Sequence, residues 1–332
     1  MSTPIGRGDG SPEAPGPLHP AMAGPQPLNP CSIGPQTGDL PSGAPQVDGD
    51  GVRRVLRLDG QPVAEFVYRD AKVLRPFFAN VRAPGSVGVT RHHPPMAGTD
   101  ATDHETMHPG VWLAFGDLNG QDFWRNQGRI EHVRFTEPPQ AKAERLRFAT
   151  ECRLLAADGA TLGSLSNRFT LIALTNAWLL VWKTDFQAGD AGLIFGDQEE
   201  MGFGARVATA ITEKHGGVIT SSSGLNTAKR TWGQPAEWCD YSGTVDGQRV
   251  GIVLMTDPAN FRPSWWHNRD YGLLVANPFG REAMKQGARS SVTVKRGESL
   301  RLCFGAAVHQ GSLEKAAELY QAFLLGNEPA SD

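Results

Sequence analysis

The sequence predicts an all-β protein, built as one large antiparallel two-sheet β-sandwich with a single C-terminal helix. Three observations predict this fold class. Short apolar or alternating runs recur from Val52 onward, Asp-Gly pairs join several of them, and helical spacing appears in one segment only. One helix against about thirteen strands excludes a doubly wound α/β fold and favours two stacked antiparallel sheets.

The first 50 residues differ in composition from the rest of the chain. They hold 11 of the 24 prolines and 9 of the 39 glycines, with few aromatic or β-branched residues. Such a segment buries too little apolar surface to offset the conformational entropy lost on ordering. We therefore expect residues 1–48 to form a disordered Pro/Gly-rich tail and residues 49–328 to form a single β-sandwich domain.

The strand pattern recurs along the remainder of the chain. Runs rich in Val, Ile, Leu and aromatic residues, either alternating with polar residues or continuous, are typical of strands with one or both faces buried. These runs lie at residues 52–58, 64–68, 73–81, 111–115, 129–135, 144–156, 168–175, 177–186, 204–211, 249–255, 271–277, 291–294 and 300–308.

Turn chemistry and one periodic segment complete the pattern. Asp-Gly pairs at 59–60, 158–159 and 246–247 lie between strand runs, and both residues tolerate the positive φ of a type I′ hairpin turn. After Ser312 as N-cap, apolar residues recur at helical spacing through Leu324, and Gly326 is placed to end the helix. Antiparallel hairpins should therefore dominate, with one helix at the C-terminus.

Composition and charge exclude several functions. A net charge of -3 and the lack of a Lys/Arg stripe argue against a nucleic-acid partner. No apolar run approaches the ~20 residues of a membrane span, and no secretory signal pattern begins the chain, so we expect no membrane partner and a cytoplasmic location. The four cysteines form no CxxC pair and are expected to be free thiols: Cys31, Cys152, Cys239 and Cys303. These patterns make no prediction about the oligomeric state.

The segment from Arg91 to His132 holds five of the nine histidines among carboxylates, glycines and aromatics. Imidazoles suit proton transfer, metal ligation or hydrogen bonding to a polar ligand, so we interpret this segment as the functional centre. His104 to His108 matches the HExxH zinc pattern, but that pattern works on a helix, and Pro109-Gly110 follow at once. No cofactor is therefore expected, although a divalent metal held by His93, His104 and His108 remains open.

Two further groups of residues carry chemistry. Glu199 and Glu200 precede a strand, where neighbouring side chains point to opposite faces, so one of them is expected in a cleft. Arg206 alternates with apolar neighbours and is expected to point inward as a charge partner. The segment from Pro263 to Arg281 gathers two tryptophans with polar groups that suit a sugar ring, namely Trp266, His267, Arg269, Asp270 and Asn277.

Several of these motifs together resemble a known family. The runs VTRHHPP, TDH-x3-HPGVWLAFGDLNGQDFWRNQGRI, FGDQEEMGFGARVAT, WCDYSG and HNRDYGLLVANPFGR are similar, in order, to the soluble bacterial family labelled methane oxygenase PmoA. The resemblance covers roughly Val52 to Gly311. Because a methane monooxygenase subunit is a membrane protein and this chain has no span, the label is interpreted as a misnomer.

The resemblance implies a galactose mutarotase-like super-sandwich and a small-molecule carbohydrate ligand, namely a sugar or keto-sugar derivative. In the mutarotase pattern a histidine acts as acid and a glutamate as base on a sugar held by the sheet. Carried over, His104 or His108 would donate a proton and Glu200 would abstract one. The remaining site residues would bind or polarise oxygens, namely Arg206, Arg269, Asp270 and, as substrate contacts, His93, Glu199, Trp266, His267, Asn277 and Asp240.

Three function classes follow. The favoured one is a carbohydrate-active enzyme using His/Glu acid-base chemistry, as an epimerase, lyase or glycoside-cleaving hydrolase. The second is a non-catalytic carbohydrate-binding module with an exposed tryptophan platform. The third is a metal-dependent oxygenase or hydrolase with a His-based site, which predicts activity lost to chelators.

Overall fold

The computed structural model describes residues 45–312 and 315–327. The predicted disordered tail lies outside the described residues except for its last few positions. There the sheet begins earlier than predicted, because β1 (Gln46–Gly49) pairs in antiparallel register with β2 (Arg53–Leu58). The described residues belong to one compact unit, Asp39–Asp332.

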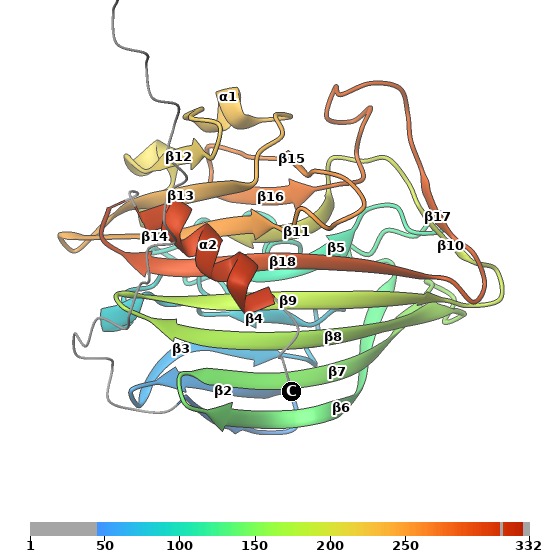
Figure 1. Cartoon of the computed structure of the whole chain (residues 1–332), viewed down its shortest axis with the longest axis horizontal. Helices are drawn as coiled ribbons and strands as arrows, with labels where there is room; N and C mark the ends of the chain where they lie inside the picture. Colours follow the sequence, from blue (N-terminus) through green and yellow to red (C-terminus); the bar gives the residue numbers. More distant parts are fainter. Residues whose placement is uncertain (1–44, 313–314, 328–332) are drawn as a thin grey trace, which may run out of the picture. The chain divides into compact units, whose positions relative to one another are not determined.

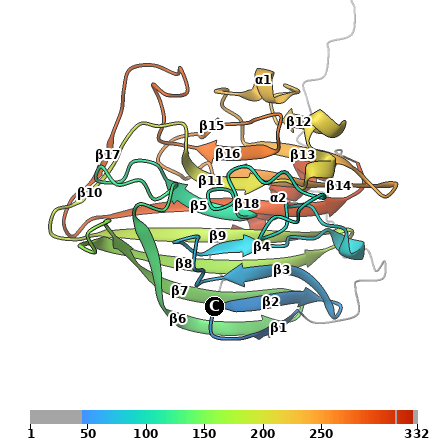
Figure 2. The same cartoon turned by 180° about the vertical axis from the view of Figure 1, so that it is seen from behind.

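Two eight-stranded antiparallel sheets confirm the predicted sandwich (Figures 1 and 2). Sheet 1 has the strand order β1-β2-β3-β4-β5-β11-β16-β15, and sheet 2 has the order β12-β13-β14-β18-β9-β8-β7-β6. Besides β1 and β2, sheet 1 contains β3 (Gln61–Val67), β4 (Phe77–Ala79), β5 (Val111–Phe115), β11 (Met201–Arg206), β15 (Trp265–Trp266) and β16 (Leu273–Asn277).

Sheet 2 contains the longest strands of the described chain. Its members are β6 (Arg129–Lys142), β7 (Arg145–Leu155), β8 (Thr161–Leu174), β9 (Ala177–Ala188), β12 (Val218–Ser221), β13 (Trp238–Val245), β14 (Gln248–Thr256) and β18 (Ser299–Gln310). A separate two-stranded ribbon joins β10 (Leu193–Phe195) to β17 (Val292–Val294). Strand β13 was not predicted, because polar Asp240 and Ser242 interrupt its apolar pattern.

The three predicted Asp-Gly turns all join hairpins. They connect β2 to β3, β7 to β8 and β13 to β14. At Asp59-Gly60 and Asp246-Gly247 both residues have positive φ, as a type I′ turn requires. Turn chemistry therefore fixed these two connections locally, while at Asp158-Gly159 only the glycine has positive φ.

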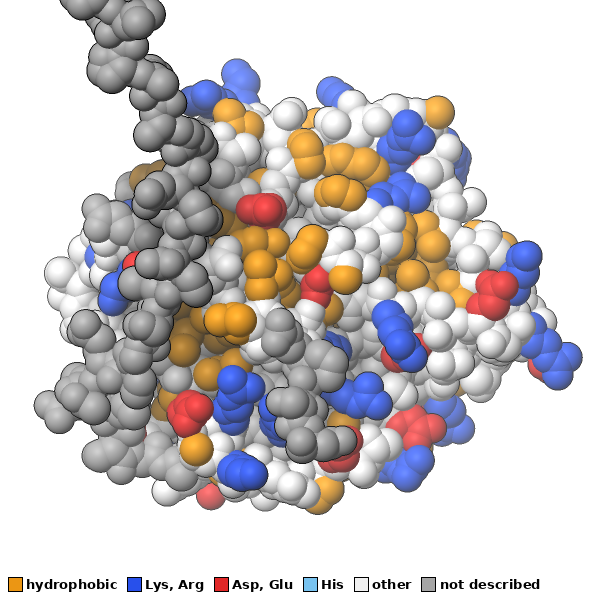
Figure 3. Space-filling model, in the orientation of Figure 1, with side chains coloured by type: hydrophobic (Ala, Val, Ile, Leu, Met, Phe, Trp, Pro, Cys, Tyr) orange, Lys and Arg blue, Asp and Glu red, His pale blue; other side chains and the backbone are white. Residues whose placement is uncertain are grey.

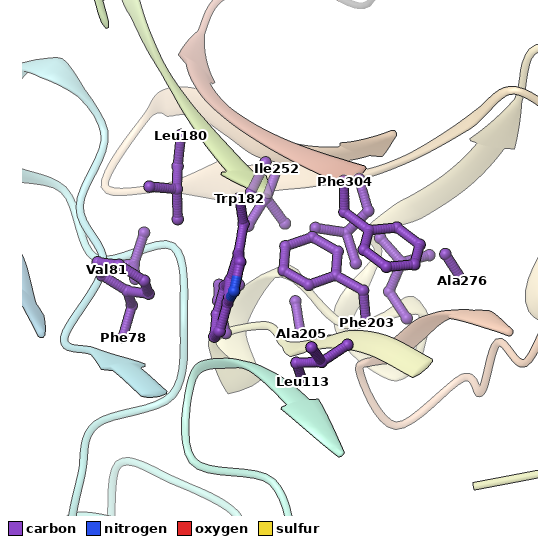
Figure 4. Close-up of a cluster of buried hydrophobic side chains, with 14 of the residues drawn as sticks. Phe78, Val81, Leu113, Leu180, Trp182, Phe203, Ala205, Ile252, Ala276 and Phe304 are labelled. Atoms are coloured by element: carbon purple, nitrogen blue, oxygen red, sulfur yellow. The ribbon is translucent and has the colours of Figure 1, made fainter. Parts of the chain in front are cut away.

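The core lies between the two sheets (Figure 4). Phe203 of β11 stacks on Phe304 of β18 with ring centroids 5.1 Å apart and meets the Trp182 ring of β9 edge-on at 5.7 Å. These contacts join sheet 1 to sheet 2 through large aromatic side chains. Cys152 and Cys239 also lie in this core, and, with Cys303, they are free thiols as predicted, whereas Cys31 lies outside the described residues.

Helix α2 (Ala316–Asn327) packs on the outer face of sheet 2 and confirms the predicted C-terminal helix. Gly326 does not end the helix as predicted but lies within its last turn. A Cβ at this position would lie 2.8 Å from Ile172 Cδ1, so the glycine permits close packing on the sheet. Figure 3 views this face, where positive and negative side chains are interspersed around apolar ones.

Short helical turns sit in the loops of the described chain: η1 (Pro84–Ser86), η2 (Thr209–Ile211), η3 (Glu213–His215) and α1 (Ala228–Thr231). Turn η2 replaces the end of the strand predicted at 204–211. Within the described ranges, no helix has the length and apolar character needed to cross a membrane.

Candidate functional site

Most of the predicted site residues meet on the outer face of sheet 1, the face away from sheet 2. Strand alternation along β11 sends Phe203 and Ala205 into the core and Arg206 to the opposite side. Arg206 lies opposite Leu273 of β16, and Leu273 is bridged in turn to Arg269. The predicted charge partner is therefore present, but it faces outward and is buried by a loop, not by the core.

That loop spans residues 91–110 and is fixed to the sheet by two buried arginines. Arg91 donates hydrogen bonds to the carbonyl oxygens of Ala101 at 2.8 Å and His108 at 3.1 Å. Arg75 donates to the carbonyl oxygen of Trp124 at 3.2 Å and also binds the carbonyl oxygen of Met107. Guanidinium groups are suited to this task because they offer five donors in a rigid fork.

Asp103 joins the loop to the sheet. Its two carboxylate oxygens accept hydrogen bonds from Arg206 Nη2 at 2.7 and 3.0 Å, and Oδ2 lies 2.7 Å from His104 Nδ1. Partial burial opposes ionisation of Asp103, but the hydrogen bonds from Arg206 and His104 and the charges of Arg206 and Arg91 hold the pKa of this carboxyl well below its usual range. Asp103 therefore orients His104 as a permanent carboxylate.

His104 occupies a strained backbone position. Its φ of 52° lies in the left-handed region, which non-glycine residues rarely adopt, and such outliers gather at functional sites. The side chain is 42% exposed. With Nδ1 held by Asp103, the ring presents Nε2 away from its carboxylate partner.

The two histidines of the HExxH pattern stack on each other, with ring centroids 5.0 Å apart. His104 stacks further on Tyr271 at 6.0 Å, and His108 stacks on Trp112 at 5.3 Å. Trp112 fits here because Gly204 opposite it lacks a side chain: a Cβ there would lie 2.9 Å from the indole. Four aromatic rings thus form a continuous column on the sheet.

His108 is buried, and its ring atom Nδ1 is already engaged. Arg206 Nη1 approaches that atom at 3.3 Å. Burial, together with the positive charges of Arg206, His104, Arg91 and Arg75, places the pKa of His108 well below its ordinary value. A neutral imidazole that accepts from an arginine is better suited to holding Arg206 than to donating a proton.

Glu199 and Glu200 lie in a bend before β11 and not in a strand, and their carboxylates bind different partners. Glu199 Oε2 accepts a hydrogen bond from Arg269 Nη2 at 2.6 Å. Burial raises the pKa of Glu199, and the negative charge of Glu200 adds to the increase, against the opposing charges of Arg269 and Lys285. Glu200 instead pairs with Arg125 at 2.5 Å.

His267 and Asn277 support Glu199 from behind. His267 Nδ1 lies 3.2 Å from Glu199 Oε2 without the orientation of a hydrogen bond. Burial, with the charge of Arg269, lowers the pKa of His267 to about 3, so its imidazole is neutral at ordinary pH. The buried Asn277 Nδ2 donates to the carbonyl oxygens of Gln198 at 2.8 Å and Glu199 at 3.0 Å. Both residues therefore position the glutamate.

Arg269, the partner of this glutamate, lines an open pocket of about 490 Å³. The guanidinium carbon of Arg269 lies 5.8 Å from the centre of the Trp232 ring, and Lys285 Nζ lies 5.5 Å from it. Asn268 Oδ1 is buried in the wall without a hydrogen-bond partner. The pocket is lined by Glu213, Thr227, Ala228, Lys229, Trp232, Asn268, Arg269 and Asp270.

We call the polar groups on this face the outer-face cluster. It comprises Asp103, His104, His108, Arg125, Glu199, Glu200, Arg206, His267, Arg269 and Tyr271. Tyr271 links the residues around His104 and Arg206 to those around Glu200 and Arg269. Its ring stacks on His104, lies 4.6 Å from the Arg206 guanidinium carbon and interacts electrostatically with Arg269 and Glu200.

Four predicted site residues lie elsewhere or take other roles. Trp266 points into the core by strand alternation, so the interpretation of its ring as a ligand platform does not fit its position. Asp240 is buried in sheet 2, where its Oδ1 lies 2.9 Å from His309 Nε2. Asp270 is exposed at the pocket rim and pairs with Lys214 at 3.7 Å.

The fourth, His93, contacts Asp70 at 3.2 Å and the edge of the Phe77 ring instead of His104 and His108. The HExxH segment forms a single turn, closed by the His108 N–H to His104 carbonyl bond, and not a helix. Among the residues that the structure describes, no group of three or more His, Cys, Asp or Glu side chains is arranged to hold a metal ion. The three-histidine ligand set is therefore not assembled.

The sequence interpretation missed several members of the cluster. Asp103 stands next to His104 and Tyr271 next to Asp270, so proximity to a predicted residue could have found both. Arg125 falls within the histidine-rich segment from Arg91 to His132, but nothing in the sequence links it to Glu200, and Trp232 of the pocket wall meets Arg269 only in the folded chain.

Comparison with solved structures finds low similarity to galactose mutarotase-like proteins. One from Lactobacillus casei is 8% identical with a TM-score of 0.35, over 80% of this chain and 100% of that one. One from Clostridium acetobutylicum is 8% identical with a TM-score of 0.36, over 80% and 95%. A putative aldose 1-epimerase from Escherichia coli K12 is 12% identical with a TM-score of 0.32, over 80% and 99%.

Likenesses this distant leave the chemistry of the site to be argued from the chain's own side chains. No curated protein matches the sequence significantly. One family model does match, over residues 53–323, and its description gives a family of unknown function without the methane-oxygenase label of the resemblance. By this match the chain belongs to the family of unknown function DUF6807.

Proposed function

We propose that the outer-face cluster is the active site of an enzyme that performs acid-base chemistry on a sugar or keto-sugar derivative, as an epimerase, lyase or glycoside-cleaving hydrolase. The observation that carries this proposal is Glu199. Its carboxyl is half-buried, has a raised pKa and is held by Arg269, which lines an open pocket. A carboxyl with a raised pKa beside a cleft is suited to general acid-base work.

Arg269 gives the glutamate an electrophilic neighbour. Binding of a substrate carbonyl oxygen to this guanidinium would make the neighbouring C–H group more acidic, and binding of a hydroxyl oxygen would do the same for its O–H group. Glu199 would take the proton in either case. The negative charge that develops on the substrate oxygen would then be stabilised by Arg269. The sequence analysis gave the role of base to Glu200, but Glu200 pairs with Arg125, which is not part of the pocket lining, whereas Arg269, the partner of Glu199, lines the pocket.

The pocket beside Arg269 supports a carbohydrate as substrate. Its wall combines the Trp232 ring with amide, carboxylate and ammonium groups. An aromatic face packs against the apolar C–H face of a sugar, while the polar groups bind hydroxyls. Asn268 contributes a buried, unpartnered Oδ1, which is suited to accept a hydrogen bond from a hydroxyl.

His104 provides the second proton-transfer group of the proposal. Asp103 accepts from Nδ1 and so fixes the ring, while Nε2 is left to exchange a proton with the substrate. In this arrangement the carboxylate orients the imidazole and the imidazole transfers the proton, as is common for positioned bases in enzymes. His108 and His267 are neutral and buried, and we assign them positioning roles for Arg206 and Glu199.

Proton NMR in deuterated buffer tests the proposal. The full-length protein is incubated with aldoses, disaccharides and 3-keto-glycosides. Deuterium entering a carbon next to a carbonyl, faster anomer exchange or glycosidic cleavage is the expected result. Glu199→Gln and His104→Gln should each reduce the observed rate by about 100-fold or more, the usual contribution of a general acid or base.

Matched control variants separate chemistry from structure. Glu151→Gln removes another arginine-paired glutamate of nearly equal exposure, 34% against 35%, on the far sheet. His92→Gln removes another aspartate-bonded histidine, with exposures of 38% for His92 and 42% for His104. Both controls should keep the parent rate. Rates that are equal in test and control variants would contradict the assignment of Glu199 and His104.

A non-catalytic carbohydrate-binding role draws on the same Trp232 pocket. It predicts saturable sugar binding that Trp232→Ala removes, with no change of any sugar in the NMR panel. If no sugar of the panel is either bound or converted, the carbohydrate proposal itself is overturned. The cytoplasmic location expected from the sequence stays a prediction.

A further inference from the structure

A second pocket, away from the outer-face cluster, opens at the β6 edge of sheet 2. There, the residues that follow β3 meet the first residues of β6, at the end of the sheets where β1 and β2 also lie (Figures 1 and 2). Its volume is about 380 Å³. The pocket is lined by Tyr68, Arg69, Asp70, Val73, Leu74, Arg75, Arg129, Ile130, Glu131, His132, Val133 and Arg153.

Positive charge exceeds negative charge in this lining, with four arginines against two carboxylates. Both carboxylates are already engaged. Glu131 Oε2 accepts from Arg153 Nε at 3.0 Å and Nη2 at 2.6 Å. Asp70 Oδ1 accepts from the backbone N–H groups of residues 72 and 73 at 2.8 Å each, and Oδ2 lies 3.2 Å from His93.

Three arginines are left without a carboxylate partner among residues 45–312 and 315–327. Arg69 donates to the carbonyl oxygen of Gly51 at 3.0 Å, and Arg75 binds only carbonyl and amide oxygens. Arg129 forms no hydrogen bond or ion pair through its side chain within these ranges. Because the side chains of Arg69 and Arg129 are exposed, their charges face the open side of the pocket.

Two polar atoms in the buried part of the lining also lack partners. These are Arg75 Nε and His132 Nδ1, on side chains that are 3% and 5% exposed. Burial, with the charges of Arg69 and Arg54, lowers the pKa of His132 to about 4, so the imidazole stays neutral beside these arginines. Buried polar atoms without partners are costly, and a ligand with several acceptor oxygens would satisfy donors here.

We propose that this pocket binds a small tetrahedral oxyanion, namely a phosphate, either free or as the phosphate group of a metabolite. Arg129 and Arg69 would bind its oxygens from the open side, because a guanidinium pairs with phosphate through two parallel N–H···O bonds. His132 would donate from Nδ1 in the corresponding neutral tautomer. The site is independent of the sugar chemistry proposed for the outer-face cluster.

Titration calorimetry of the full chain with inorganic phosphate, at constant ionic strength against chloride, tests this inference. Saturable binding of phosphate is expected. Arg129→Gln should weaken it by about tenfold or more, the effect of losing charge-assisted hydrogen bonds. Arg129 is the residue to change because its exposed side chain has no partner within the described ranges, so folding should be retained.

Arg134→Gln is the matched control, because Arg134 is an exposed arginine of the same strand that pairs with Glu151 instead of lining the pocket. It should bind phosphate like the parent protein. Equal weakening in both variants, or heat effects that chloride reproduces, would overturn the proposal.

A second titration with glucose 6-phosphate separates the two sources of phosphate. Tighter binding than inorganic phosphate, lost in Arg129→Gln but retained in Glu199→Gln, would support a phosphorylated metabolite at this pocket. Binding of inorganic phosphate alone, with the same loss in Arg129→Gln, would support a free anion. Binding that is lost only in Glu199→Gln would contradict a phosphate site here.

Discussion

The two outer faces of the sandwich are covered in opposite ways. On sheet 2, helix α2 lays apolar side chains such as Phe323 and Leu319 on Val253 and Met255. On sheet 1, a loop of residues 91–110 is held by buried arginines and brings charged groups against the strands. The cover on sheet 2 is made by apolar burial, whereas the cover on sheet 1 uses hydrogen bonds that hold polar side chains against the strands.

Each face contains a histidine–aspartate pair, and the two pairs differ in environment more than in geometry. The N···O distance is 2.7 Å for His104 and Asp103 and 2.9 Å for His309 and Asp240. The first pair is 42% and 40% exposed, the second 2% and 1%. A substrate can reach only the first of these two pairs, so burial excludes the second as a catalytic pair.

The largest expected effect comes from the apolar face. Phe323 is fully buried, and its ring lies on Gly305, where a Cβ would be 2.7 Å away. Phe323→Ala should lower the free energy of unfolding by about 3–5 kcal/mol through lost burial and the cavity that remains. Urea denaturation followed by circular dichroism measures the change.

The same helix offers a control. Leu325 is 68% exposed, so Leu325→Ala should change stability by no more than about 0.5 kcal/mol. Similar losses in the two variants would show that α2 is not held on sheet 2 by its buried side chains.

On the polar face, Arg206→Met should cost about 3 kcal/mol. The substitution keeps an unbranched side chain on β11 but leaves Asp103 without its bidentate partner, and breaking a buried ion pair from one side is strongly destabilising. Since Asp103 is 40% exposed, water compensates part of the loss. A stability equal to that of the parent, measured by urea denaturation, would mean that the loop does not depend on this contact.

Stability should also depend on pH through His267. Its folded-state pKa of about 3 lies below the ordinary value of 6.5, so the unfolded chain binds more protons between these pH values. The free energy of unfolding therefore falls as pH is lowered through this window, by about 2 kcal/mol from pH 7 to pH 5 for this one residue.

His267→Asn should remove that part of the slope in urea titrations at the two pH values. Phe323→Ala, which changes no titrating group, should lower stability and keep the slope. If the slope of His267→Asn equals that of the parent, the imidazole is not held neutral behind Glu199.

The smallest effect is expected at the exposed rim of the cluster. Arg125 is 40% exposed and pairs with Glu200 and Asp122, and exposed ion pairs contribute little because water and salt screen them. Arg125→Met should change the free energy of unfolding by less than about 1 kcal/mol. If Arg125→Met lowers the free energy of unfolding as much as Arg206→Met does, the exposed arginine contributes as much to stability as the buried one, contrary to this expectation.

The sequence alone determined the features that depend on neighbouring residues. Period-two runs and the Asp-Gly pairs at 59–60 and 246–247 predicted antiparallel hairpins, and helical spacing predicted α2, because hydrophobic period and turn conformation are local properties. The histidine-rich segment and the twin glutamates were also singled out as candidate site residues, and His104, His108, Glu199 and Glu200 lie in the outer-face cluster. Their residue types already restrict them to hydrogen-bonded or charged surroundings.

Tertiary structure alone decided which of these groups meet and which are accessible. Trp266 and Asp240 were expected as ligand contacts, but strand alternation buried the first in the core and sheet packing buried the second. Arg125 and Trp232 joined the site from separate loops. Accessibility, cross-sheet contacts and shifted pKa values arise from residues far apart in the chain, and no local pattern in the sequence encodes them.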